Sequence, residues 1–299
     1  HPVERFGCTV CHGGQGPAVD EVRAHGHVPY WSEPLFDSSL ERQHGIRSDG
    51  RVLIQIACNA CHRYADATPG MGQINRAKSL VIDKGCRACH RINGRGGLVG
   101  PDLTSEGDKN PEQFDYTRLE GRPSVFAWQK AHFADPRSLV PDTVMPNFHF
   151  APEDLQALAM LVMSWRDDRV APELLRGLPQ DDPPPEEERL RAAEMEKGPG
   201  AWFVRTGCYQ CHPVAVLGVQ SPTPIGPDLS TAAEDTERRF SRSIDDFVRN
   251  PVGTMKAVFA RQFMLSAEEK EAAIRALRAA YAEYQAQLAA GKSPLARTP

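Results

Sequence analysis

The chain has 299 residues and a formal net charge of −4, from 35 Lys and Arg against 39 Asp and Glu. This length is sufficient for two or three domains of ordinary size, and the charge balance excludes the basic surface expected of a nucleic-acid-binding protein. The most apolar stretch, residues 157–165, is far shorter than the roughly 20 residues of a membrane helix, so we expect no membrane span. The informative residue type is cysteine, which occurs eight times, in four pairs.

Each cysteine pair has the spacing C-x-x-C and is followed at once by a histidine. The four motifs are Cys8, Cys11 and His12; Cys58, Cys61 and His62; Cys86, Cys89 and His90; and Cys208, Cys211 and His212. This is the attachment sequence of c-type haem, in which the thiols add to the porphyrin vinyl groups and the histidine is the proximal iron ligand. Zinc sites, a thioredoxin-like dithiol or structural disulfides would leave the histidine after each pair unexplained. The sequence therefore predicts four covalently bound haem c groups, numbered 1 to 4 along the chain.

Haem c is attached outside the cytoplasm, which indicates an exported protein that is periplasmic or extracellular. The chain begins with His1 and shows no charged n-region and no apolar h-region. We therefore expect that a signal peptide or membrane anchor is absent from this chain.

Residues 1–80 contain haems 1 and 2, whose proximal histidines are 50 residues apart. Few periodic apolar positions occur here, so we expect a loop-rich dihaem segment whose haems form much of its core. The segment resembles the N-terminal dihaem part of multihaem cytochromes linked to respiratory electron-transfer complexes. The resemblance rests on Cys11-His-Gly-Gly-Gln-Gly16, Ala24-His-Gly-His27 and Tyr30-Trp-Ser-Glu-Pro34.

Three histidines between these two motifs are the predicted distal ligands of haems 1 and 2. The resemblance favours His25, and we rank His27 above His44 for the second ligand. His25 and His27 would serve two haems only if the chain bends at the glycine between them. His1 is either an ordinary terminal residue or a haem ligand, in a neighbouring subunit for example.

The remaining chain contains an internal repeat. Residues 85–90 match residues 207–212, the Gly-Pro-Asp-Leu sequence at 100–103 recurs at 226–229, and residues 132–136 match residues 247–251. A final helix is predicted from near Pro152, with one apolar face formed by Leu155, Leu158, Val162 and Trp165. Its counterpart is predicted from near Ala267, after a capping box at residues 266–269.

The order of haem motif, Gly-Pro loop, Met-bearing loop and C-terminal helix resembles class I cytochrome c. The resemblance covers residues 80–170 and 200–285 and implies a mainly α fold, with two small helical domains that each surround one haem. We expect a dihaem segment over residues 1–80 and cytochrome c-like domains over 81–176 and 200–299. Residues 177–199, rich in proline and acid, are predicted to form an extended linker.

The distal ligand of haem 3 is predicted from the same resemblance, and that of haem 4 from the methionines near the equivalent position. Met145 lies 55 residues after His90 and precedes a proline, as the family pattern requires for haem 3. For haem 4 the ungapped partner of Met145 is Ala260, so the pattern fails there. Met255 is the preferred ligand, and Met264 or an open iron are the alternatives.

These features predict an electron-transfer protein, not an enzyme, and no catalytic residue is assigned. We expect it to act as a subunit or partner of a respiratory electron-transfer complex, with redox proteins, including a membrane quinol-oxidising complex, as partners. A Met/His ligand pair raises the haem potential, so electrons should enter at haems 1 and 2 and leave through haem 3 or 4. The alternatives are an enzyme that reduces peroxide or a nitrogen oxide at an open haem 4, and a polymerising extracellular cytochrome wire.

Overall fold

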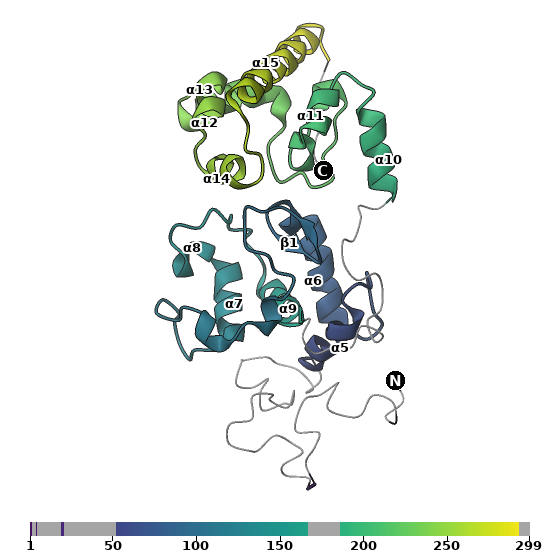
Figure 1. The fold of residues 1–299 in the computed structure, drawn as a ribbon, viewed down its shortest axis with the longest axis vertical. Coiled ribbons are helices and arrows are strands. Elements are labelled where there is room, and N and C mark those ends of the chain that lie inside the picture. Colours follow the sequence, from purple (N-terminus) through teal and green to yellow (C-terminus); the bar gives the residue numbers. More distant parts are fainter. Residues whose placement is uncertain (2–3, 5–18, 21–51, 167–185, 293–299) are drawn as a thin grey trace. The chain divides into compact units, whose positions relative to one another are not determined.

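The computed structural model describes residues 1, 4, 19–20, 52–166 and 186–292. It divides into two compact units, of which unit 1 comprises residues 1–81 and 102–180, and unit 2 comprises residues 82–101 and 181–299. The described residues are mainly helical, which confirms the predicted fold class (Figure 1). Their one sheet is a two-stranded hairpin. The boundaries of these two units differ from those of the domains predicted from the sequence. The predicted domains stay predictions.

The described residues of unit 1 form five α-helices and two short 3-10 helices. In chain order these are α5 (Ile54–His62), α6 (Gly72–Asp83), η2 (Glu106–Asp108), η3 (Pro111–Gln113), α7 (Val125–Ala134), α8 (Pro136–Leu139) and α9 (Pro152–Met163). The last turn of α6 passes into the first residues of unit 2.

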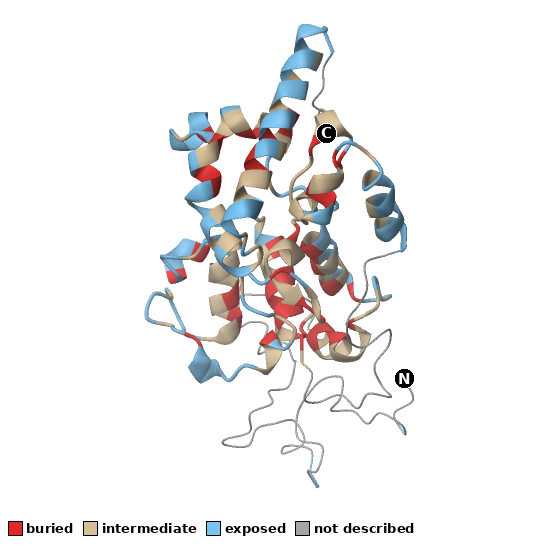
Figure 2. Cartoon of the chain, turned by 45° about the horizontal axis from the view of Figure 1, so that its top comes forward, coloured by how far each residue is buried: buried red, intermediate tan, exposed pale blue. Residues whose placement is uncertain are grey.

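Helix α9 is the centre of the unit 1 core. It begins at Pro152, as predicted, because proline fits the first helical position, where no backbone N–H is needed. Leu158, Val162 and Trp165 are buried, whereas Leu155 is only partly buried. Helices α5 and α7 both pack against α9, and Figure 2 colours the buried residues of these helices red.

The second half of the predicted dihaem segment is more regular than the sequence suggested. Helices α5 and α6 occupy much of residues 52–83, and apolar side chains in and directly before them are buried, namely Leu53, Ile56, Ile74, Ala77 and Val81. An ion pair between Arg76 of α6 and Asp154 of α9 adds to this packing. The expectation of a loop-rich segment was therefore wrong for the helical parts of residues 52–80.

Unit 2 combines a short hairpin region with the C-terminal helices. Its elements are η1 (Cys86–Ala88), β1 (Arg91–Ile92), β2 (Arg95–Gly96), α10 (Glu186–Met195), α11 (Ala201–Arg205), η5 (Cys208–Gln210), η6 (Ala215–Leu217), η7 (Leu229–Thr231), α12 (Ala232–Phe240), α13 (Ile244–Arg249), α14 (Thr254–Arg261) and α15 (Ala267–Ala289). The core joins α11, α13 and α15 through apolar side chains that include Phe203, Val204, Ile244, Val248, Ile274 and Leu277.

Helix α15 begins at the predicted capping box. The Ser266 hydroxyl accepts a hydrogen bond from the Glu269 backbone N–H (3.2 Å), and the Glu269 carboxylate accepts one from the Ser266 backbone N–H (2.7 Å). These two bonds satisfy N–H groups that a helix start leaves without partners. The backbone hydrogen bond from Ser266 lowers the pKa of Glu269.

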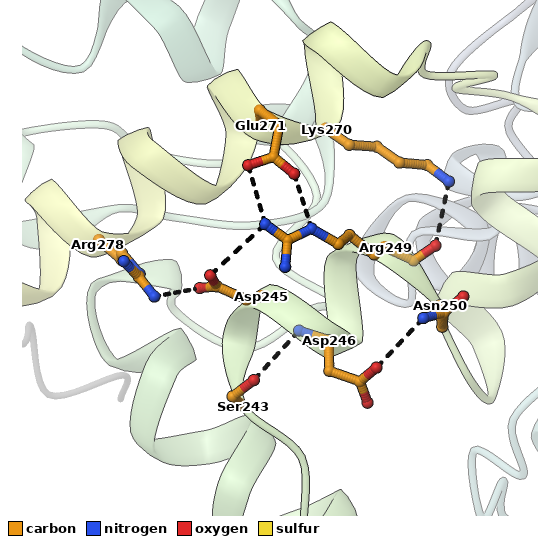
Figure 3. A network of polar contacts seen from close by, with 8 residues as sticks. All are labelled: Ser243, Asp245, Asp246, Arg249, Asn250, Lys270, Glu271 and Arg278. Atoms are coloured by element: carbon orange, nitrogen blue, oxygen red, sulfur yellow. Dashed lines mark hydrogen bonds and ion pairs between the residues drawn. The ribbon is translucent and has the colours of Figure 1, made fainter.

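Ion pairs fasten α13 to α15 along their exposed sides (Figure 3). The guanidinium of Arg249 on α13 donates two hydrogen bonds to Glu271 on α15, at 2.7 and 3.0 Å. Arg278 of α15 reaches back to Asp245 of α13 at 2.8 Å. The paired geometry of an arginine and a carboxylate fixes the direction of both side chains, so the network adds directed contacts to the apolar packing of the two helices.

The predicted linker contains a helix. Residues 186–195 form α10 instead of extended chain, so that expectation was wrong for these residues. Three glutamates in the first turn favour the helix through its positive N-terminal end, and Glu187 pairs with Arg191 one turn later.

Candidate haem-attachment sites

The third and fourth cysteine motifs have the same backbone. Each begins with a glycine in the left-handed region, Gly85 (φ 63°) and Gly207 (φ 80°), followed by one turn of 3-10 helix. The backbone N–H of His90 then bonds the carbonyl of Cys86 at 2.9 Å, and the equivalent bond from His212 measures 3.1 Å. Residues three and four positions apart in a helical turn lie on one side of it, so the two cysteines and the histidine can face one porphyrin edge.

After each histidine the chain turns back by a short antiparallel pairing. In the third motif β1 pairs with β2 across Asn93 and Gly94, both with positive φ, which is the common Asn-Gly hairpin turn. In the fourth motif Val214 pairs with Val219. Neither turn was predicted from the sequence, although Asn-Gly after a histidine motif was a usable indication of the first.

The returning chain places the Gly-Pro repeat against the imidazole. The backbone N–H of Gly100 bonds the carbonyl of Cys89, and that of Gly226 bonds the carbonyl of Cys211, both at 2.8 Å. A Cβ atom on Gly100 would lie 2.4 Å from Cε1 of His90, and one on Gly226 would lie 2.2 Å from Cε1 of His212. Both positions therefore require glycine because of close approach to the ring.

The proline of the repeat orients each imidazole. Nδ1 of His90 lies 2.9 Å from the carbonyl oxygen of Pro101, and Nδ1 of His212 lies 2.8 Å from that of Pro227. A carbonyl only accepts, so Nδ1 carries the proton and Nε2 keeps its lone pair for a metal. This second partner of a ligating histidine fixes its tautomer and raises its basicity.

The next residue of the repeat shapes the loop after the proline. The Asp102 carboxylate accepts a hydrogen bond from the backbone N–H of Thr104, and that of Asp228 accepts one from Ser230, both at 2.8 Å. The sequence identified Gly-Pro-Asp-Leu only as a repeated pattern, and the structure gives three of its four residues a role in positioning the histidine or the loop.

The environment of these loops suits neutral thiols and a neutral imidazole. Burial raises the pKa of Cys86 and Cys211 to about 11, and it also raises the pKa of Cys89 and Cys208. Redox-active dithiols need a lowered thiol pKa, so these pairs do not resemble a thioredoxin-like site. Burial also lowers the pKa of His212. None of these four cysteines forms a disulfide.

The second motif is built differently. Cys58, Cys61 and His62 lie in the last turns of α5, on one face of the helix because of their spacing. Between them, Asn59 is fully buried and donates a hydrogen bond to Ser164 after the end of α9 (2.7 Å). Lys78 of α6 donates to the carbonyl of His62 at 2.9 Å, so both neighbouring helices hold this motif in place.

The predicted distal ligands are placed only in part. Met145 lies half-buried in the loop between α8 and α9, in unit 1. Met255 is half-buried in the first turn of α14, and Met264 is 79% exposed. The pairing of these methionines with a haem stays a prediction. The first motif, Cys8, Cys11 and His12, and the candidate ligands His25, His27 and His44 lie outside the described residues.

These loops fit a covalently bound haem. Paired thiols and an imidazole lie within one turn, Nδ1 of each ring lies at a proline carbonyl so that Nε2 keeps the lone pair, and a glycine cradle leaves no room for a side chain beside the ring. Among residues 52–166 and 186–292, no helix is both long and apolar enough to cross a membrane.

The comparison with known families agrees with this geometry. Residues 74–165 match the family Cytochrome c, a range that runs from α6 to just after α9 and includes the third motif and Met145. No curated protein and no solved structure shows significant similarity to the chain. Cytochrome c domains bind haem c covalently, generally transfer electrons and are typically found outside the cytoplasm. The match therefore supports a c-type cytochrome with a haem-based role in electron transfer.

Proposed function

We propose that this protein is a tetrahaem c-type cytochrome, exported to the periplasm or the cell exterior, that passes electrons along its four haems. The observation that carries the proposal is the hydrogen bond from a proximal imidazole to a proline carbonyl, built twice in loops 122 residues apart. The sequence outside residues 74–165 repeats the same attachment motif three times. The second of these loops lies outside residues 74–165, so it supports a further haem site beyond the one cytochrome c domain that the family comparison finds.

The protein's own residues tune the potentials of the haems. A bound haem supplies reversible one-electron exchange at its iron. The carbonyls of Pro101 and Pro227 make the imidazoles of His90 and His212 stronger donors, which favours the oxidised iron. Thioether ligation by Met145 and Met255 would favour the reduced iron instead, and it would raise the potential above that of a bis-histidine haem. Electrons therefore enter at haems 1 and 2 and leave through haem 3 or 4.

The count of haems is tested by the mass of the intact protein and by the pyridine haemochrome spectrum. Four haems are expected, and replacement of both cysteines of one motif by alanine should remove one. A redox titration of the same variants assigns each potential. Fewer than four haems in the wild-type protein would overturn the count, and the two lowest potentials at haems 3 and 4 would overturn the direction of electron flow.

The distal ligand of haem 4 distinguishes an electron carrier from a haem enzyme. Met255→Ala should convert one haem from low-spin to high-spin, whereas Met264→Ala should not, because Met264 is 79% exposed. Low-spin signals from all four ferric haems in the wild-type protein support the carrier. A high-spin haem 4 in the resting protein would instead favour reduction of peroxide or a nitrogen oxide.

The redox partner is proposed to be a basic protein of a respiratory complex, such as a membrane quinol-oxidising complex. Glu186 and Glu187 of α10 are exposed, and haem propionates add to the net charge of −4. Opposite charges steer association and lose this effect as salt screens them. The rate of electron exchange with a basic redox protein should fall as ionic strength rises, and a rate independent of salt would contradict a charged docking face.

A further inference from the structure

Two histidines that are 61 positions apart in the sequence point at each other in unit 1. Nε2 of His1 lies 3.4 Å from Nε2 of His62, the histidine of the second motif. The two ring centroids are 5.6 Å apart, well beyond the distance between the Nε2 atoms. The rings therefore meet end to end through Nε2, with an angle of 69° between their planes.

The Nε2 separation lies between that of a hydrogen bond and that of two ligands on one metal, and the end-to-end direction of the rings is the one that two such ligands share. Stacked rings would bring their faces together, and hydrogen bonds between nitrogen and an acceptor are commonly about 2.7–3.2 Å long. Imidazole nitrogens bind metals at about 2.0 Å, so two imidazoles on opposite sides of one iron stand about 4 Å apart at their donor atoms. The observed Nε2 separation needs only a small opening to reach that value, and each ring can turn about its own bond to the metal.

The position of His62 suits such a pair. Its side chain shares a helix face with Cys58 and Cys61, and its carbonyl is held by Lys78, so the proximal side is fixed. His1 is exposed, so its ring meets His62 without being packed into the protein core.

We infer that His1 is the distal axial ligand of haem 2, opposite His62. The inference rests on the proposed function, because it requires a haem at Cys58 and Cys61. It makes haem 2 a bis-histidine haem of low potential, as expected for the entry side of the chain. It also leaves only one of His25, His27 and His44 to be needed as a ligand, for haem 1.

The test uses the purified full-length protein with its haems attached. His1→Ala should convert one low-spin haem to high-spin in the electron paramagnetic resonance spectrum and change one midpoint potential. His1→Met should restore a low-spin haem with a raised potential and a near-infrared magnetic circular dichroism band typical of Met/His ligation. The matched control is His149→Asn, which removes an exposed histidine with φ 52°, and asparagine tolerates this backbone. The control should leave all four haems unchanged.

Two further measurements assign the effect to haem 2 and to this chain. In a variant with Cys58 and Cys61 replaced by alanine, His1→Ala should cause no additional spectral change, and an additional change would overturn the inference. Of the single alanine variants of His25, His27 and His44, only one should contain a high-spin haem. High-spin haems in two of these variants would also overturn the inference. A spectrum of the wild-type protein that changes on dilution would show ligation from a second copy and overturn it as well.

Failure of this inference is distinguishable from failure of the proposed function. Four haems by mass together with an unchanged His1→Ala spectrum would overturn the ligand assignment and leave the tetrahaem cytochrome intact. An unmodified second motif in the mass spectrum would overturn both.

Discussion

Replacement of Gly226 by alanine tests how the proximal imidazole is held. The new Cβ would lie 2.2 Å from Cε1 of His212, whereas non-bonded carbon atoms favour about 3.5–4.0 Å. The ring or the loop must therefore move by about 1 Å or more. From its present 2.8 Å, the bond from Nδ1 to the carbonyl of Pro227 would then exceed the length at which it counts as a hydrogen bond.

The expected cost follows from these two effects. Loss of the hydrogen bond removes about 1 kcal/mol, and residual crowding adds about 1–3 kcal/mol. The free energy of unfolding should fall by about 2–4 kcal/mol in total. Because the imidazole becomes a weaker donor, the midpoint potential of haem 4 should rise. Guanidinium unfolding followed by haem absorbance measures the first quantity, and spectroelectrochemical titration measures the second.

Gly72→Ala is the matched control, because no atom lies within 4 Å of its added Cβ and its backbone is not left-handed. Gly100→Ala should repeat the effect at haem 3, where the approach to His90 is 2.4 Å. Stability and potential equal to those of the wild-type protein in Gly226→Ala would refute the view that the glycine and the proline carbonyl position the imidazole.

Three further predictions concern stability. Asn59→Ala should lower the free energy of unfolding by about 1–3 kcal/mol, because it removes the buried bond to Ser164, as measured by guanidinium unfolding. The Arg249 guanidinium lowers the pKa of Glu271, so the ionised carboxylate stabilises the protein above its unfolded pKa and this contribution is lost as pH falls through the lowered folded value. Glu271→Gln should therefore show a smaller loss of urea stability on acidification than the wild-type protein. Ser266→Ala should cost about 1 kcal/mol in urea unfolding through loss of the cap.

Each of these has a control in the same region. Ser164→Ala should cost as much as Asn59→Ala, and additive effects in the double variant would mean that the two residues do not interact. Glu268→Gln, on the same turn as the capping box, removes a carboxylate that does not pair with Arg249 and should change the acid dependence less than Glu271→Gln does, and an equal change would point to general charge instead. Ser266→Thr keeps a capping hydroxyl and should retain most of the stability.

The sequence by itself predicted the chemistry of attachment and determined several helix boundaries. A cysteine pair followed by histidine is a local pattern, and so are the proline at the start of α9 and the capping box at the start of α15. Short-range signals of this kind act within one turn, so they are readable without the fold. Where the apolar pattern was short, as in α5, or the segment was rich in acid and preceded by proline, as in α10, the helix was missed.

Only the tertiary structure decided which distant residues face each histidine. Gly226 lies against His212 because the chain turns back between Val214 and Val219, a path that no periodicity in the sequence specifies. The burial of Asn59 on Ser164 joins residues 105 positions apart. The approach of His1 to His62 likewise joins residues 61 positions apart. The motif predicts the proximal ligand because its residues are adjacent in the chain, whereas the residue on the opposite side of a haem would be whichever one the fold brings there.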